Sequence, residues 1–80
     1  MRVVSKDGTT NFSYENNAFC VIEEEYEEGK TRWAIGVRSL DLAKYMPLAN
    51  FETKEEAVNA LKRMAGFAAQ GVTENYVYKL

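Results

Sequence analysis

The sequence predicts an α+β domain in which an antiparallel sheet of about five strands is covered on one face by one long helix. Two segments alternate apolar and polar residues around Asp-Gly or Glu-Gly pairs, a pattern typical of β-hairpins. One further segment, residues 54–70, carries apolar residues at helical spacing. Because a single helix covers only one side of a sheet, we expect the other side to remain open.

The first fourteen residues predict a hairpin that turns at Asp7-Gly8, a pair that accepts positive φ angles. With Lys6 paired to Thr9, Val3 lies opposite Phe12. Strand alternation then collects four apolar side chains on one face. They are Met1, Val3, Phe12 and Tyr14.

Residues 18–26 and 31–38 predict a second hairpin, with its turn at Glu28-Gly29 and with Glu27 paired to Lys30. In a regular hairpin this pairing divides the side chains between two faces. The face expected under the helix contains Cys20, Ile22, Glu24, Trp33, Ile35 and Val37. The reverse face is expected to contain Phe19, Val21, Glu23, Glu25, Arg32, Ala34, Gly36 and Arg38.

The remaining elements follow from turn and capping signals. A short helical turn is expected after Ser39, through Leu40, Leu42, Ala43 and Met46 up to Pro47, followed by a strand over 48–52. The capping box Thr53-Lys54-Glu55-Glu56 starts a helix that Gly71 ends. Its apolar stripe is Ala57, Leu61, Met64, Ala65 and Ala68, with Val58 at the edge. Residues 72–80 form a last strand with Tyr76 and Tyr78 on one side and Val77 on the other.

Size and composition limit the classes of function. One domain, residues 1–80, is expected, because two cores would each be too small to fold alone. The chain has no His and only one Cys, so neither a metal nor another cofactor is expected. A core this small seldom contributes more than about 3–5 kcal/mol, which makes a homodimer or small homo-oligomer the expected means of further stabilisation.

A net charge of −2 argues against nucleic-acid binding, and no apolar run is long enough for a membrane span. The unpaired Cys favours a reducing cytoplasm.

Two candidate chemical groups have simpler structural explanations. The glutamates around Tyr26, at positions 23–25, 27 and 28, suit an acidic decoy or a cation site, but alternation splits them between two faces and the register pairs some of them with bases. Cys20 has no His to activate it and lies in an apolar strand, so it is interpreted as a small hydrophobic residue and not as a nucleophile. Trp33 is likewise assigned to the core beneath the helix.

The reverse face of the second hairpin is the most interesting candidate site. The candidate interface consists of a shallow floor, Ala34 and Gly36, with Phe19 and Val21 alongside it. An Arg beside an aromatic ring suits a phosphorylated base, because the guanidinium binds oxyanions and the ring stacks. The candidate ligand-binding residues are Phe19, Arg32, Arg38, Tyr76 and Tyr78. A nucleotide site, a protein interface and a plain exposed face all fit this pattern.

The chain also resembles a group of small phage and prophage proteins of Gram-positive bacteria. At the start of the chain the resemblance lies in Met1–Ser5, followed by Asp7-Gly8 and Tyr14-Glu15. In the second half it lies in Thr53–Ala57 with the helix that follows, and in the aromatic last strand. These are turn and core residues, so the resemblance implies a shared fold and carries no active-site residue. It implies a phage-encoded accessory protein in the bacterial cytoplasm.

The expected function is therefore binding without catalysis. A counter-defence factor fits the setting, one that sequesters a nucleotide immune signal or inhibits a host defence protein. The alternatives are a structural or regulatory accessory protein that docks on a phage or host complex, and a small hydrolase of a nucleotide signal. The last is the weakest, because the chain lacks His and metal ligands.

Overall fold

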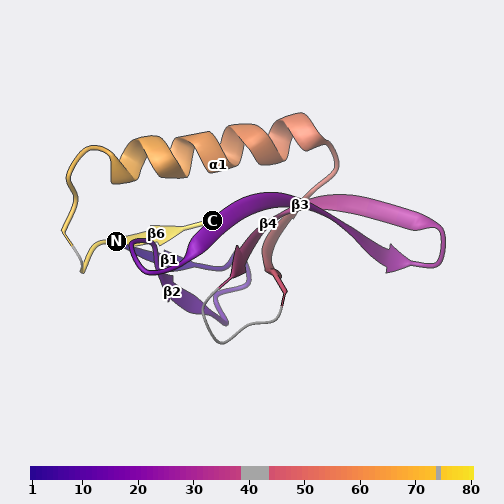
Figure 1. Cartoon of the computed structure of the whole chain (residues 1–80), viewed down its shortest axis with the longest axis horizontal. Coiled ribbons are helices and arrows are strands. Elements are labelled where there is room, and N and C mark those ends of the chain that lie inside the picture. Colours follow the sequence, from indigo (N-terminus) through magenta and orange to yellow (C-terminus); the bar gives the residue numbers. More distant parts are fainter. Residues whose placement is uncertain (39–43, 74) are drawn as a thin grey trace.

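The computed structural model describes residues 1–38, 44–73 and 75–80, and it confirms the α+β class (Figure 1). Within these residues, six strands form two three-stranded sheets, ordered β2-β1-β6 and β3-β4-β5, beside one helix. The strands thus divide between two sheets where one was expected, and β6 pairs with β1 in parallel. The elements are β1 (Arg2–Val4), β2 (Asn11–Ser13), β3 (Ala18–Glu27), β4 (Lys30–Arg38), β5 (Met46–Phe51), α1 (Lys54–Ala68) and β6 (Val77–Lys79).

The hairpin of β1 and β2 has the predicted register, with Val3 opposite Phe12. Gly8 adopts a φ of +79°, as its place in the turn requires. The Asp7 carboxylate accepts hydrogen bonds from Ser5 Oγ at 2.6 Å, from the Thr9 amide at 3.0 Å and from Thr9 Oγ1 at 2.7 Å. The bond from Ser5, followed by those from Thr9, lowers the pKa of Asp7 to about 2.

The hairpin of β3 and β4 turns where predicted, but its two faces differ from the prediction. Glu27 pairs with Lys30, and Gly29 has a φ of +76°. A register shift between Glu25 and Glu27 makes Tyr26 the extra residue of a β-bulge. A one-residue slip transfers every side chain of β3 to the opposite face relative to β4. The predicted pairing of Val21 with Gly36 is therefore wrong, and Val21 lies opposite Ile35 instead.

The segment before the helix also differs from expectation. Residues 39–43, which hold most of the expected helical turn, lie outside the described residues. Met46, expected to end that turn, begins strand β5, and Pro47 lies within the strand. β5 is an edge strand and its register with β4 shifts between Ile35 and Gly36, the kind of place where a strand tolerates proline.

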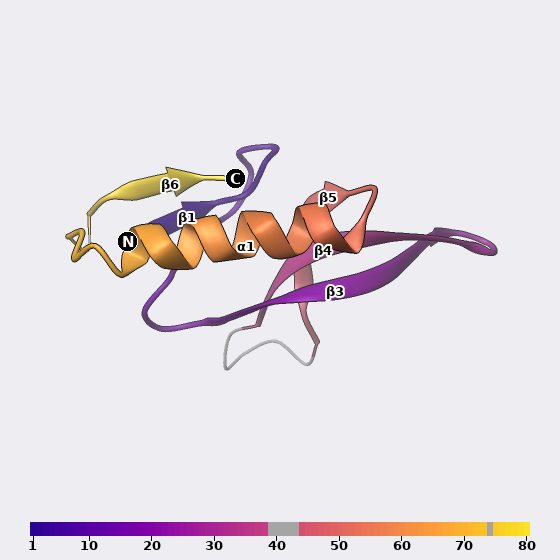
Figure 2. The same ribbon diagram turned by 90° about the horizontal axis from the view of Figure 1, so that it is seen from above.

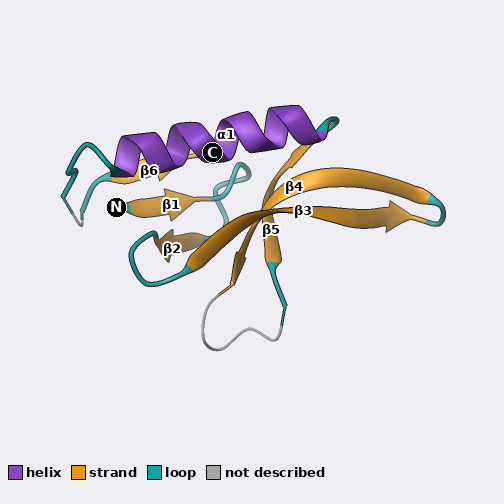
Figure 3. Ribbon diagram, turned by 45° about the horizontal axis from the view of Figure 1, so that its top comes forward, coloured by secondary structure: helices purple, strands orange, loops and turns teal. Residues whose placement is uncertain are grey.

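Helix α1 begins and ends close to the predicted residues. Thr53 Oγ1 accepts a hydrogen bond from the Glu56 amide at 3.2 Å, and Gly71 follows the helix with a φ of +79°. The buried residues of the helix are Ala57, Ala60 and Met64. Ala65 is exposed, whereas Ala60, which the prediction left out, is buried. The apolar stripe was therefore predicted slightly too far around the helix. Figure 3 shows the last turns of α1 beside β6 and β1 and its first turns beside β4.

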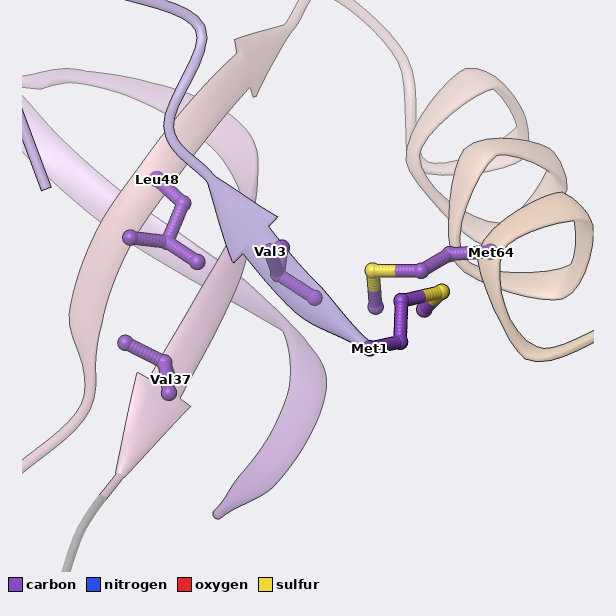
Figure 4. Close-up of a cluster of buried hydrophobic side chains, with 5 residues drawn as sticks. All are labelled: Met1, Val3, Val37, Leu48 and Met64. Atoms are coloured by element: carbon purple, nitrogen blue, oxygen red, sulfur yellow. The ribbon is translucent and has the colours of Figure 1, made fainter. Parts of the chain in front are cut away.

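The core joins both sheets to the helix (Figure 4). It contains Met1 and Val3 from the first sheet, Val37 and Leu48 from the second, and Met64 from α1. The Lys6 amide donates a hydrogen bond to the Leu48 carbonyl at 3.0 Å, which ties the end of β1 to β5. Within the described ranges, no helix combines the length and apolar character needed to cross a membrane.

The molecule is elongated, with principal extents of 42 × 27 × 19 Å. Figures 1 and 2 show why: the far end of the β3–β4 hairpin extends well past the first turn of α1. We call this projecting segment, residues 23–32, the arm.

Candidate interaction surface

The sheet β3-β4-β5 has one side turned toward α1 and one side turned away from it. Trp33 lies on the helix side, where the Lys54 ammonium is 5.5 Å from the centre of its ring. Alternation along β4 then places Ile35 and Val37 on that side too, and both are fully buried. Trp33 thus lies on the predicted side of the sheet, but it is only half-buried and is not part of the core. The side turned away, which we call the open face, contains Cys20, Ile22, Glu24, Arg32, Ala34 and Gly36, joined by Tyr45.

The centre of the open face is closely packed. Ala34 and Gly36 are buried, although they lie on the side without a helix. A Cβ atom at Gly36 would lie 2.9 Å from Ile22 Cδ1 and 3.1 Å from Tyr45 Cβ. Only glycine therefore lets Ile22 and Tyr45 close over the strand at this position. The floor predicted from Ala34 and Gly36 exists, but Ile22 and Tyr45 cover the Gly36 part of it.

Tyr45 is held in a small polar environment at one end of the open face. A hydrogen bond with Cys20, the electrostatic interaction with the same residue and burial raise the pKa of Tyr45, while the positive charge of Arg38 opposes the change. The phenol offers a hydrogen-bonding group beside apolar side chains. Cys20 is half-buried, in keeping with its interpretation as a small hydrophobic residue.

The other end of the open face carries a charged and aromatic group at the base of the arm. Arg32 Nε donates a hydrogen bond to Glu24 Oε1 at 3.0 Å, and the guanidinium lies 4.8 Å from the centre of the Tyr26 ring. Beside them is a surface depression of about 300 Å³. Its lining residues are Tyr26, Arg32, Asn50, Phe51 and Glu52. Stacking and hydrogen-bonding groups thus meet at one shallow hollow.

The arm is acidic. Residues 23–32 contain five glutamates against Lys30 and Arg32. Glu27 lies 3.3 Å from Lys30, and Glu24 pairs with Arg32. Within the described part of the chain, the carboxylates of Glu23, Glu25 and Glu28 enter no ion pair, and no three possible metal ligands gather at one place. The glutamates therefore form a solvated tip whose negative charge is only partly balanced.

The structure does not bring the predicted ligand-binding residues together. Phe19 lies opposite Val37 on the helix side, packs against the core and stacks on Tyr14 with ring centres 5.5 Å apart. The predicted interface residue Val21 moves to the helix side with it. Only Arg32 keeps its predicted role as an Arg beside an aromatic ring, and that ring is Tyr26. The bulge explains each of these changes, because the prediction assumed a regular hairpin.

Tyr78 lies in β6 of the other sheet, and Tyr76 directly precedes that strand. Their rings flank Phe67 of α1, with centres 4.9 and 5.6 Å from the Phe67 ring. Tyr78 packs against the core, whereas Tyr76 is 42% exposed. Arg38 is exposed at the far end of β4, opposite Ala18. A nucleotide pocket that combines Arg32 and Arg38 with Phe19, Tyr76 and Tyr78 is therefore wrong for the single chain.

The sequence assigned Cys20, Ile22 and Glu24 to the helix side, and it gave no role in the surface to Tyr26, Tyr45 or Asn50. Tyr26 is the one aromatic residue within a run of glutamates, and this break in the acidic pattern is the signal that marks it. No comparable signal marks Tyr45 or Asn50, since both depend on how β5 pairs with β4. Comparison of the chain with protein-family models, curated proteins and solved structures finds no match.

Proposed function

We propose that this protein acts by binding another protein through the open face and the base of the arm, without catalysing a reaction. The observation that carries the proposal is the composition of this surface. It joins half-buried apolar side chains, Cys20, Ile22 and Tyr45, to the Arg32–Tyr26 pair. Aromatic and Arg side chains at the border of an apolar patch are the residue types that dominate protein interfaces.

The shape of the molecule supports docking. The arm extends beyond the body and carries an exposed aromatic ring, Tyr26 at 47% exposure, among acidic side chains. An extended acidic arm is attracted to a basic surface, and the charge increases the rate of encounter. Taken with the resemblance to phage and prophage proteins, the partner class is a host defence protein that this chain inhibits. The alternative is an accessory role in which the same surface docks on a phage or host complex.

Sequestration of a nucleotide signal is the second candidate, and the depression beside Arg32 favours it. Its volume of about 300 Å³ is at the lower end for small-molecule sites. Tyr26 supplies a ring for stacking, Arg32 a cation for a phosphate and Asn50 an amide. The Glu24 carboxylate on Arg32 weighs against a phosphate, since an anion must compete with it.

Native mass spectrometry of the protein isolated from phage-infected bacterial cells separates these functions. A partner chain bound to the wild type and lost from Arg32→Ala and Tyr26→Ala supports docking through this surface. The matched control is Lys62→Ala, on the exposed side of α1, which should keep the partner. A small molecule released intact on heating supports sequestration, whereas a chemically altered product indicates an enzyme. Binding that survives both arm variants contradicts the proposed surface.

A further inference from the structure

Strand β3 has a free edge. In the order β3-β4-β5 it is an outer strand, and its ten residues, Ala18–Glu27, form the longest strand of the fold. Within residues 1–38, 44–73 and 75–80, β3 makes no backbone hydrogen bond to any element other than β4. An edge strand presents a row of unpaired amide and carbonyl groups, which are able to pair with another strand.

The two halves of this edge differ. The half that belongs to the arm is protected, because it carries glutamates and a β-bulge at Tyr26, and both features discourage strand pairing. The half nearer the body, Ala18–Ile22, carries no charged side chain. It reads Ala-Phe-Cys-Val-Ile, which favours strand structure and lacks the usual protective residues. Pairing with another strand is therefore expected to centre on the unprotected half.

We infer that the occupant of this edge is β3 of a second copy, paired antiparallel about a two-fold axis at Val21. Residues that lie opposite each other on two paired strands point to the same side of the sheet. The two-fold axis must therefore pass beside one residue and its own copy, and not between two consecutive residues. With the axis at Val21, Cys20 lies opposite Ile22 of the second copy, and both are on the open face. Pairing over residues 17–25 adds roughly eight to ten backbone hydrogen bonds and joins the two sheets into one of six strands.

The charges favour this antiparallel arrangement over a parallel one. With the axis at Val21, Glu23 lies opposite Phe19, Glu24 opposite Ala18 and Glu25 opposite Asn17 of the second copy, so that no two glutamates face each other. A parallel, in-register pair would place each glutamate beside its own copy, which is unfavourable.

Arg38 adds an attraction to the same register. It lies opposite Ala18 within its own chain, and it is exposed. Because Ala18 is small, the Arg38 side chain can extend across it toward Glu24 of the second copy. The two-fold axis repeats this contact, so one dimer contains two such pairs. The edge of β3 is therefore complementary to a second copy of itself, both in its backbone hydrogen-bonding groups and in its charges.

Ala18 provides a test in which folding and pairing respond in opposite directions. Ala18→Glu places a carboxylate opposite Arg38 of its own chain, which stabilises the folded monomer. It also places this carboxylate opposite Glu24 of the second copy, and the repulsion destabilises the dimer. We expect the dimer dissociation constant to rise about tenfold or more. Ala18→Lys reverses both effects, and the dissociation constant is expected to fall by about threefold. Sedimentation velocity over a concentration series measures these constants, and thermal unfolding of the monomer checks the fold.

The register itself is tested by Ile22→Cys. Oxidation with diamide, which removes the two thiol hydrogens, should link Cys20 to the new cysteine of the second copy and give a reducible dimer. Wild type, whose Cys20 lies opposite Ile22, should remain uncrosslinked. A wild type that is monomeric at all concentrations overturns the inference, as does a dimer that is unaffected by Ala18→Glu or uncrosslinked through Ile22→Cys. Arg32→Ala should leave the dimer intact, so loss of the partner proposed above and loss of the dimer remain distinguishable.

Discussion

Replacing Gly36 by Ala tests the packing of the open face with one added methyl group. The new Cβ would lie 2.9 Å from Ile22 Cδ1 and 3.1 Å from Tyr45 Cβ, both shorter than the optimal carbon–carbon separation of about 3.5–4.0 Å. Overpacking typically costs about 1–3 kcal/mol, while Gly to Ala in a strand gains about 0.5–1 kcal/mol. The expected result is a net loss of about 1 kcal/mol in the free energy of unfolding.

A second substitution identifies the cause of this loss. Ile22→Val removes Cδ1, the nearer of the two crowded atoms, and by itself costs about 0.5–1.5 kcal/mol. In the Ile22→Val background, Gly36→Ala should cost less, so the two changes should be coupled by about 0.5–1 kcal/mol. Val21→Ala is the matched control. Val21 lies on the helix side, opposite Ile35, and its change should add to Gly36→Ala within about 0.5 kcal/mol.

Urea unfolding followed by the fluorescence of Trp33, the only tryptophan, gives all of these free energies. The reasoning is refuted if Gly36→Ala couples to Val21→Ala and adds independently to Ile22→Val. That outcome would mean that Val21 shares a face with Gly36, as in a hairpin without the bulge.

Three further changes test other parts of the fold. Thr53→Ala should lower the free energy of unfolding by about 1 kcal/mol, because the hydrogen bond from the Glu56 amide is lost. Thr53→Ser keeps the hydroxyl group and should not lower it. If both variants lowered the free energy of unfolding equally, the side-chain cap would not be the cause. Met64→Ala, at a fully buried position, should cost about 2–5 kcal/mol in the same urea assay, and a cost below 1 kcal/mol would contradict the core. The pKa of Asp7 falls from 3.8 to about 2 on folding, so its stabilisation is complete above 3.8 and disappears as the pH falls through 2. The difference in melting temperature between wild type and Asp7→Asn should therefore shrink between pH 4 and pH 2, and a constant difference would contradict this role.

Local signals in the sequence were sufficient for the two hairpin turns and the helix. In the Asp7-Gly8 and Glu28-Gly29 turns both glycines adopt positive φ, whereas Asp7 and Glu28, where positive φ was also acceptable, do not. The Thr53 cap and Gly71 mark the ends of the helix region in the same way. These features depend on neighbours a few residues away, which is why they were predicted correctly.

Nonlocal pairing was not predictable in the same way. The division into two sheets depends on β6 joining β1, a parallel pair between the two ends of the chain. The bulge at Tyr26 depends on how two strands twist against each other, and no turn residue announces it. The bulge changes the composition of the proposed docking surface. One extra residue moved Phe19 and Val21 to the helix side and brought Cys20 and Ile22 to the open face.

The composition of the open face, on which the proposed docking depends, can be measured directly by nuclear Overhauser effects in solution. The account predicts a strong effect between the Ile22 δ1 methyl group and the Gly36 α protons, and one between the Ile22 side chain and the Ala34 methyl group. Strong effects from the Val21 methyl groups to Gly36 and Ala34, with none from Ile22, would contradict it.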